Sequence, residues 1–144
     1  ITEYKNKSSF TIEKDDIEIF RQIDRVVRDM FVPDLGFDEK NISIELSCHM
    51  LAEAMSEIFD LKCVRGYYMI GYEHSWLITK NRNIIDVYPW GMVGGPVLIA
   101  HNIVNRNGPL YIEDDGLDFG SCTSGYKRSV ASIKEAIGEL IAHY

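Results

Sequence analysis

Three residues of the types that thiol-dependent enzymes use occur in chain order as Cys48, His74 and Asp86. A thiol of ordinary pKa is only slightly ionised at neutral pH, so a cysteine nucleophile needs an imidazole partner or a helix N-terminus to become a thiolate. A carboxylate behind the imidazole fixes its tautomer and its orientation. The sequence therefore predicts Cys48 as nucleophile, His74 as base and acid, and Asp86 as the orienting group.

The stretch around Cys48 has the pattern of an amphipathic helix. If Ser47 is the N-cap, Cys48 lies in the first turn, where free backbone N–H groups and the helix dipole favour a thiolate. If Asn41 or Ser43 is the cap, Cys48 lies more than one turn inside the helix. In both cases the thiol belongs to an apolar stripe, which also fits a small buried residue without chemistry. The stripe consists of Cys48, Leu51, Ala52, Met55, Ile58 and Phe59.

His74 and Asp86 fall in segments rich in branched and aromatic residues. Three such segments, 63–70, 74–79 and 84–88, follow the helix. This composition is typical of strands, and the short connections between the segments favour antiparallel pairing. We therefore expect a three-stranded meander after the helix.

The length of the second connection decides whether His74 and Asp86 can meet. Side chains alternate between the two faces of a strand, so these two residues share a face only if an odd number of residues joins their strands. A symmetric four-residue turn at 80–83 would point them to opposite faces. The sequence leaves both geometries open.

The remaining elements complete an α+β pattern. A first helix is predicted from Asp15 or Asp16 to Pro33, and a last helix from near Ser129 or Ser132, where Ser132 with Glu135 forms a possible capping box. Segments 97–103 and 108–112 are predicted strands. We expect one domain over residues 1–144, in which the cysteine helix packs on an antiparallel sheet of about five strands with helices at both ends of the chain.

Further side chains are candidates for the substrate cleft. The backbone N–H of Cys48 is the first candidate for an oxyanion donor, and Asn41 is a second. Trp76, Tyr88 and Trp90 are candidate cleft residues, since a glycine-rich segment follows the third strand; a plain turn that packs Trp90 on the core is the alternative. His49 and His101 are interpreted as ordinary polar positions.

Composition and charge exclude several classes of function. With 46% hydrophobic and 26% charged residues, the chain has the composition of a soluble globular protein. Its net charge of -7 and its scattered basic residues argue against nucleic acid as a partner. An apolar run of the roughly 20 residues that cross a bilayer is missing. We expect a protein or peptide substrate and no membrane partner, while the oligomeric state stays open.

Cysteine spacing and the acidic segment give no support for a metal or another cofactor. Cys48, Cys63 and Cys122 form no C-x-x-C pair, and residues 113–118 lack the ligand spacing of a calcium loop. A metal site built from Cys48, His49, His74 or Asp86 is a weaker alternative to the thiol site. The chain begins at Ile1 without an apolar signal segment, so we expect a trimmed chain that is cytoplasmic or delivered as a secreted effector or toxin domain.

These motifs together resemble a known family. Cys48 heading a helix, followed by 63–67 (CVRGY), 74–78 (HSWLI) and 85–89 (IDVYP), is similar to the core of the transglutaminase-like branch of the papain-like cysteine enzymes. The resemblance implies a Cys48-His74-Asp86 triad acting on an amide, as a peptidase, glutamine deamidase, amidase or transglutaminase-type enzyme. The alternative is a non-catalytic protein-binding module that retains the fold and buries an inert Cys48.

Overall fold

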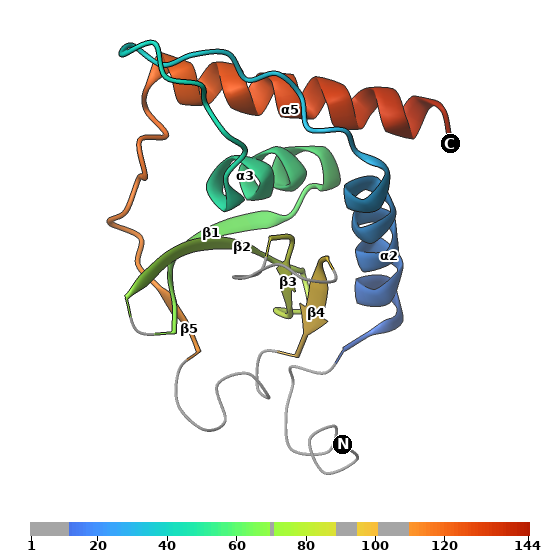
Figure 1. The fold of residues 1–144 in the computed structure, drawn as a ribbon. Helices are drawn as coiled ribbons and strands as arrows, with labels where there is room; N and C mark the ends of the chain where they lie inside the picture. The colour runs from blue at the N-terminus through green and yellow to red at the C-terminus, as the bar shows by residue number, and fades with distance from the viewer. Residues whose placement is uncertain (1–11, 70, 89–94, 101–109) are drawn as a thin grey trace.

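The computed structural model describes residues 12–69, 71–88, 95–100 and 110–144. Among these residues it contains three helices and five strands (Figure 1). In chain order the elements are α2 (Lys14–Asp29), α3 (Cys48–Phe59), β1 (Lys62–Tyr68), β2 (Tyr72–Ile78), β3 (Ile84–Asp86), β4 (Val97–Ile99), β5 (Tyr111–Glu113) and α5 (Ser124–Ala142).

All five strands form one antiparallel sheet in the order β4-β3-β2-β1-β5. In Figure 1, α3 lies between the sheet and α5, while α2 stands beside the sheet near β3 and β4. This arrangement confirms the predicted α+β class, the antiparallel meander of β1 to β3, and the helices at the two ends of the chain.

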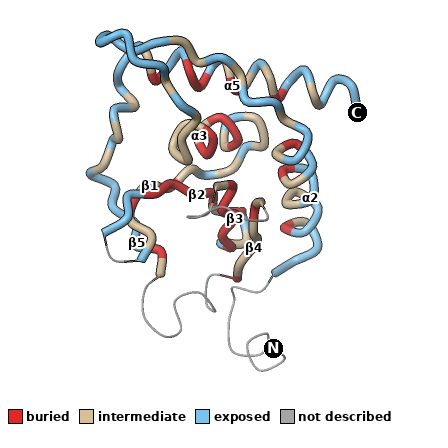
Figure 2. The backbone as a smooth tube through the Cα atoms, in the orientation of Figure 1, coloured by how far each residue is buried: buried red, intermediate tan, exposed pale blue. Residues whose placement is uncertain are grey.

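Two apolar clusters form on the two faces of the sheet, because neighbouring residues of a strand point in opposite directions. On one face Leu77 and Ile85 pack with the buried residues of the three helices. On the other face Trp76 and Ile84 pack with Val64 and Tyr111. Figure 2 shows the buried positions gathered along the central strands and on α3. His74 is two residues from Trp76, so its side chain lies on the face of the second cluster.

The connection between β2 and β3 places His74 and Asp86 on one face. Leu77 pairs with Ile85 and Ile78 pairs with Ile84, so residues 79–83 form a connection of five residues. The odd length excludes the symmetric four-residue turn that would have separated the two side chains. In this register Asp86 lies opposite Trp76, and it is a diagonal neighbour of His74.

The first helix holds this turn in place. Asp16, which is 1% exposed, accepts hydrogen bonds from Asn83 Nδ2 at 2.9 Å and from Asn81 Nδ2 at 3.2 Å. Inside the turn, Thr79 N–H donates to the carbonyl of Asn83. Bonds inside the turn and a contact from α2 therefore hold this connection together.

The helix boundaries differ from those expected from sequence. α2 begins at Lys14, one residue before the predicted start, because Glu13 and Asp16 form a capping box. It ends at Asp29 rather than at Pro33, since Met30 is already extended, with a ψ of 127°.

The predicted start of the last helix at Ser129 or Ser132 is wrong. α5 begins at Ser124, where the Thr123 side chain accepts from the Tyr126 N–H. Ser129 Oγ instead donates back to the carbonyl of Gly125 inside the helix, which is the usual bond of a serine within a helix.

The two last strands are shorter than predicted. β4 ends at Ile99 and β5 begins at Tyr111. The end of the predicted strand 97–103 and the start of the predicted strand 108–112 lie outside the described residues.

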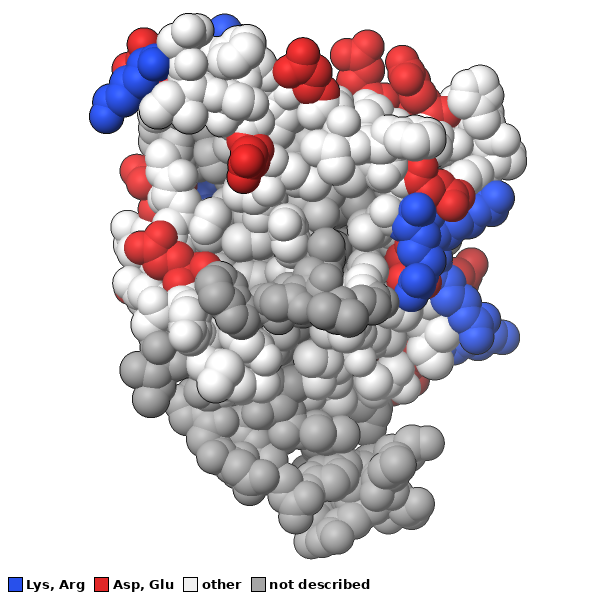
Figure 3. Space-filling model, in the orientation of Figure 1, with Lys and Arg blue, Asp and Glu red and all other residues white. Residues whose placement is uncertain are grey.

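Charged side chains are distributed over the surface. In Figure 3 the largest group of basic side chains on the visible face lies over α2, where acidic side chains lie among them, and other basic side chains lie at the upper left and at the top of the view. Among the described helices, none has the length and apolar content needed to cross a lipid bilayer.

Candidate active site

Cys48 is the first residue of α3. Ser47 is the N-cap, with extended backbone angles, and its Oγ accepts a hydrogen bond from the Met50 N–H at 3.3 Å. This confirms the Ser47 start over the alternatives at Asn41 and Ser43. The half-buried thiol therefore lies at the positive end of a 12-residue helix, where a negative charge is favoured.

The imidazole of His74 and the carboxylate of Asp86 form a hydrogen bond. His74 Nε2 lies 2.8 Å from Asp86 Oδ2, and the two residues are 2% and 0% exposed. Because a carboxylate can only accept, Nε2 carries the proton, and Nδ1 is the ring nitrogen left for Cys48. This is the orientation that a thiol–imidazole–carboxylate chain requires.

Two more groups donate to the Asp86 carboxylate. The Tyr111 hydroxyl donates to Oδ2 at 2.7 Å, and the Tyr88 N–H donates to Oδ1 at 3.1 Å. A buried carboxylate is stable as an anion only when such donors compensate the lost water. Tyr111 was missed from sequence because it lies on a short strand 25 residues away, and nothing in the local pattern marks it.

The protonation states of Cys48 and His74 are coupled. Burial raises the pKa of Cys48, but hydrogen bonds from His49 and His74 outweigh it and lower this pKa to about 6. Burial lowers the pKa of His74, but the hydrogen bonds with Asp86 and Cys48 raise this pKa to about 9. At neutral pH the site therefore holds a thiolate next to an imidazolium.

The other two thiols have different surroundings. Burial raises the pKa of Cys63 to about 11, so this thiol stays protonated at neutral pH. Cys122 is exposed on the segment before α5. Of the two thiols with a shifted pKa, only Cys48 is shifted toward the thiolate.

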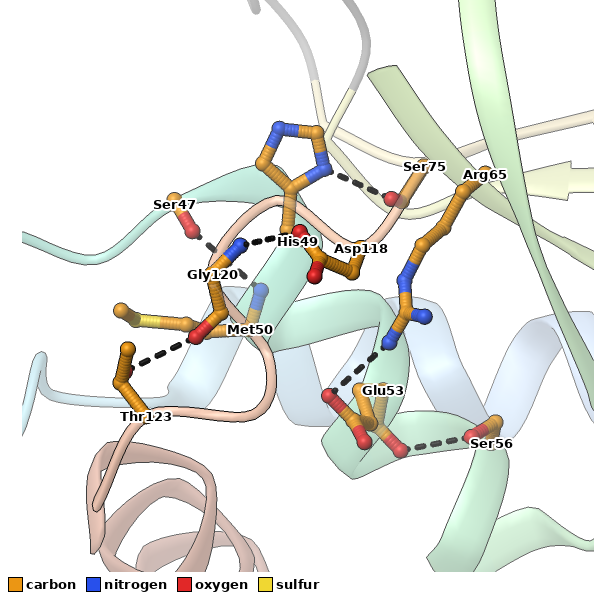
Figure 4. Close-up of polar contacts among 10 residues, drawn as sticks. All are labelled: Ser47, His49, Met50, Glu53, Ser56, Arg65, Ser75, Asp118, Gly120 and Thr123. Carbon is orange, nitrogen blue, oxygen red and sulfur yellow. Dashed lines mark hydrogen bonds and ion pairs between the residues drawn. The ribbon is translucent and has the colours of Figure 1, made fainter. Parts of the chain in front are cut away.

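His49, which was interpreted as an ordinary polar position, contacts two segments that are distant in the sequence. Its Nδ1 lies 2.7 Å from Ser75 Oγ, and its ring stacks on Phe119 with the centroids 3.9 Å apart. Figure 4 shows the ring extending from α3 toward Ser75 on β2. Ser75 directly follows His74, so this contact joins His49 to the strand that carries His74. His101, the other histidine interpreted in that way, lies outside the described residues.

Three of the four predicted cleft residues can be located. Trp76 is 2% exposed and stacks beside His74, with 6.1 Å between the ring centroids, so it supports the imidazole from within the core. Tyr88 contributes its backbone N–H to Asp86. Asn41 lies exposed in the turn 38–42 with a φ of 60°, and its role as an oxyanion donor stays a prediction. Trp90 lies outside the described residues.

A cavity of about 520 Å³ opens beside the start of α3. Its apolar wall comes from the loop before α3, from Met50, and from the segment that leads into α5. The apolar lining residues are Ile42, Ile44, Met50, Phe119 and Tyr126, and the charged ones are Asp38, Glu39, Lys40 and Arg128. Phe119 connects this cavity to the catalytic candidates, because the same ring stacks on His49.

The acidic segment 113–118 is built from local turns. Asp114 Oδ1 accepts from the Gly116 N–H, and Asp118 Oδ1 accepts from the Gly120 N–H. Within the part of the chain that the structure describes, no group of three or more His, Cys, Asp or Glu side chains is arranged to hold a metal ion.

Comparison with known proteins adds no relative: no family model, no curated protein and no solved structure matches this chain.

Proposed function

We propose that this chain is a thiol-dependent acyl-transfer enzyme that acts on an amide of a protein or peptide through Cys48, His74 and Asp86. The observation that carries the proposal is the 2.8 Å hydrogen bond between His74 Nε2 and Asp86 Oδ2, which leaves Nδ1 for a thiol at a helix N-terminus. This combination supplies a nucleophile, a proton carrier and an orienting group.

The chemistry follows from the protonation states. The Cys48 thiolate attacks the carbonyl carbon and forms a C–S bond, and the carbonyl electron pair moves to oxygen. When the tetrahedral intermediate collapses, the C–N bond breaks, and the His74 imidazolium gives its proton to the leaving nitrogen. Neutral His74 then takes a proton from water or from an amine, which attacks the thioester and releases Cys48.

The start of α3 offers donors for the oxyanion. The Met50 N–H is occupied by Ser47 Oγ, so the N–H groups of Cys48 and His49 are the candidate donors in the first turn. Both N–H groups lie on the backbone next to the Cys48 sulfur. The negative oxygen develops on the carbon that this sulfur attacks, and therefore close to both groups. We propose these two groups in place of an upstream side chain.

The order of the elements supports a more specific fold, and the cavity supports a class of substrate. The order of cysteine helix, histidine strand and aspartate strand supports a transglutaminase-like variant of the papain-like core. The cavity beside α3 has room for a substrate side chain, and its apolar wall with a charged rim suits a segment of polypeptide. Peptide cleavage, glutamine deamidation and transfer to an amine all fit this site.

Labelling with iodoacetamide tests the nucleophile. We expect Cys48 to react at pH 7 well before Cys63, because only the former has its pKa lowered to about 6. The rate at each cysteine is read from its tryptic peptide by mass spectrometry. The variants Cys63→Ser and Cys122→Ser serve as matched controls and should leave labelling of Cys48 unchanged. Equal labelling of the three thiols, or none at Cys48, would support the non-catalytic binding module instead.

Mass spectrometry of candidate substrates tests the reaction. Proteins and peptides incubated with the enzyme are searched for a cleaved bond, for the mass shift of deamidation, and for a product joined to an added amine. Activity should vanish in Cys48→Ser and fall by roughly 10³-fold or more in Asp86→Asn, since loss of the orienting carboxylate leaves the imidazole in the wrong tautomer. A reaction that persists in Cys48→Ser would exclude the thiol mechanism.

A further inference from the structure

His49 makes contacts that an ordinary surface histidine does not need. Its Nδ1 is 2.7 Å from Ser75 Oγ, and Ser75 is fully buried. The ring also stacks on Phe119 at an interplanar angle of 26°. Two different segments, β2 and the loop before α5, thus fix one imidazole directly next to Cys48.

We propose that His49 is a second histidine of the active site, a positioning residue that holds the Cys48 thiolate from the side opposite to His74. This inference rests on the proposed function and extends it. The two imidazoles have separate roles: His74 with Asp86 carries the proton of the reaction, while His49 with Ser75 and Phe119 fixes and stabilises the sulfur.

The geometry of β2 separates the two rings. His74 and Ser75 are successive residues of the strand, so their side chains leave opposite faces of the sheet. His74 bonds to Asp86 on one face, while Ser75 bonds to His49 on the face covered by α3. Both imidazoles lower the pKa of the thiol at the start of α3. The two rings that stabilise the thiolate are thus anchored on opposite faces of β2.

The loop before α5 is strained where it meets His49. Phe119 has a φ of 50°, a left-handed conformation that is unfavourable for an aromatic residue. Local bonds keep this conformation: Asp118 Oδ1 accepts from the Gly120 N–H, and the Gly120 carbonyl accepts from Thr123 (Figure 4). The Phe119 ring lies on His49, and Phe119, Gly120 and Thr123 also line the cavity.

The pH dependence of Cys48 alkylation measures this role. The titratable groups facing the thiol are His49 on α3, His74 on β2 and Cys63 on β1. In the parent protein the alkylation midpoint should lie near pH 6. In His49→Phe, which keeps an aromatic ring against Phe119 but has no nitrogen, we expect the midpoint to rise by about one pH unit or more, since a hydrogen bond to a charged group is lost.

Two further variants separate positioning from mere packing. His49→Gln retains a polar donor and should recover part of the shift, whereas a packing role would make His49→Phe the milder change. His143→Phe, a histidine exchange at the C-terminal end of α5, is the matched control and should leave the midpoint unchanged. Circular dichroism and the unfolding midpoint verify that each variant folds. If His49→Phe does not fold, Ser75→Ala replaces it, because it removes the ring's anchor and should also raise the midpoint.

The outcomes distinguish this inference from the proposed function. An unchanged midpoint in His49→Phe, or in Ser75→Ala where that variant replaces it, would overturn the role of His49. An unchanged midpoint in His74→Ala would overturn the Cys48–His74 pair and with it the proposed function. Upward shifts in both His49→Phe and His74→Ala, with His143→Phe at the parent value, are the expected result.

Discussion

The hydroxyl of Tyr111 donates to Oδ2 of Asp86, the same oxygen that accepts the hydrogen bond of His74. The two donors come from strands at different places in the sheet, β5 at one edge and β2 at the centre. Because both bonds converge on one oxygen, the carboxylate cannot rotate without losing them. Tyr111 therefore fixes the direction in which Asp86 presents its charge to His74.

Removal of this hydroxyl should cost stability. Tyr111→Phe deprives a buried carboxylate of one donor, and a hydrogen bond to a charged group contributes about 1.5–3 kcal/mol. We expect a loss of that size in the free energy of unfolding, measured by urea denaturation. Tyr68→Phe is the control, because the ring of Tyr68 contacts Tyr111 edge-on at 5.1 Å and belongs to the same cluster. Equal losses in the two variants would show that the bond to Asp86 is not what matters.

The turn between β2 and β3 depends on a residue of α2. Asp16→Ala removes the buried acceptor of the Asn83 amide and the longer of the two bonds from the Asn81 amide, for which we expect a loss of about 2–3 kcal/mol. Because the same contact holds the turn that aligns His74 with Asp86, labelling of Cys48 at neutral pH should fall as well.

The neighbouring acid provides the matched control for this turn. Asp15 is partly exposed, forms an ion pair with Lys80 at 2.8 Å and accepts a hydrogen bond from Asn81 Nδ2 at 2.9 Å. Its exchange to alanine should cost less than that of Asp16, since polar contacts at exposed positions contribute little. A loss in Asp15→Ala as large as that in Asp16→Ala would show that the buried position of Asp16 is not the cause.

Local patterns predicted the parts of the site that local forces determine. Ser47 was one of the candidate caps. Because side chains alternate along a strand, contact between His74 and Asp86 depended on one quantity, the odd or even number of residues in the turn between their strands (its parity). The parity itself stayed open, because the turn is held partly by a contact that local patterns do not show, the bond from Asn83 to Asp16, 67 residues away.

Contacts between distant segments were also beyond the sequence. Tyr111 reaches Asp86 from another strand, and His49 reaches Ser75 across 26 positions. Neither contact leaves a periodic signal, since each depends on how the elements pack. The start of α5 was misplaced for a local reason: two serines inside the helix looked like caps, while Thr123 is the residue that acts as one.

Gly66 should be intolerant of a side chain because β5 lies against it. A Cβ at this position would overlap the carbonyl oxygen of Ile112. That neighbour is backbone, so β5 would have to move, and Tyr111 with it. We expect Gly66→Ala to lose about 3 kcal/mol of unfolding free energy and to weaken the bond from Tyr111 to Asp86.

A second glycine provides the matched control for this exchange. Gly138 lies in α5 with open space around it. Gly138→Ala should therefore stabilise the helix by about 0.5–1 kcal/mol. Both variants are compared by thermal denaturation under the same conditions. A Gly66→Ala protein as stable as the parent would show that β5 does not approach this closely.

The pH dependence of stability and that of thiol reactivity should be very different. The pKa of His74 rises from 6.5 to about 9 on folding, so its contribution to stability is full below pH 6.5 and is lost as pH rises through 9. The pKa of Cys48 falls from 9.0 to about 6, so its contribution is full above pH 9 and is lost as pH falls through 6. The two shifts are opposite and nearly equal. The folded and unfolded chains therefore bind almost the same number of protons on this pair, which should add little pH dependence to the free energy of unfolding.

A probe specific for the sulfur should nevertheless detect the exchange of the proton between Cys48 and His74. The ultraviolet absorbance of the thiolate, taken as the difference between the parent and Cys48→Ala, should appear with a midpoint near pH 6. Urea denaturation of the parent should give a free energy of unfolding to which this pair adds little pH dependence between pH 6.5 and 9, whereas Cys48→Ala keeps the pKa of His74 raised by Asp86 and should lose stability as pH rises above 6.5. A thiolate midpoint near the ordinary value of 9.0 would mean that the proton stays on sulfur and that Cys48 and His74 are independent groups.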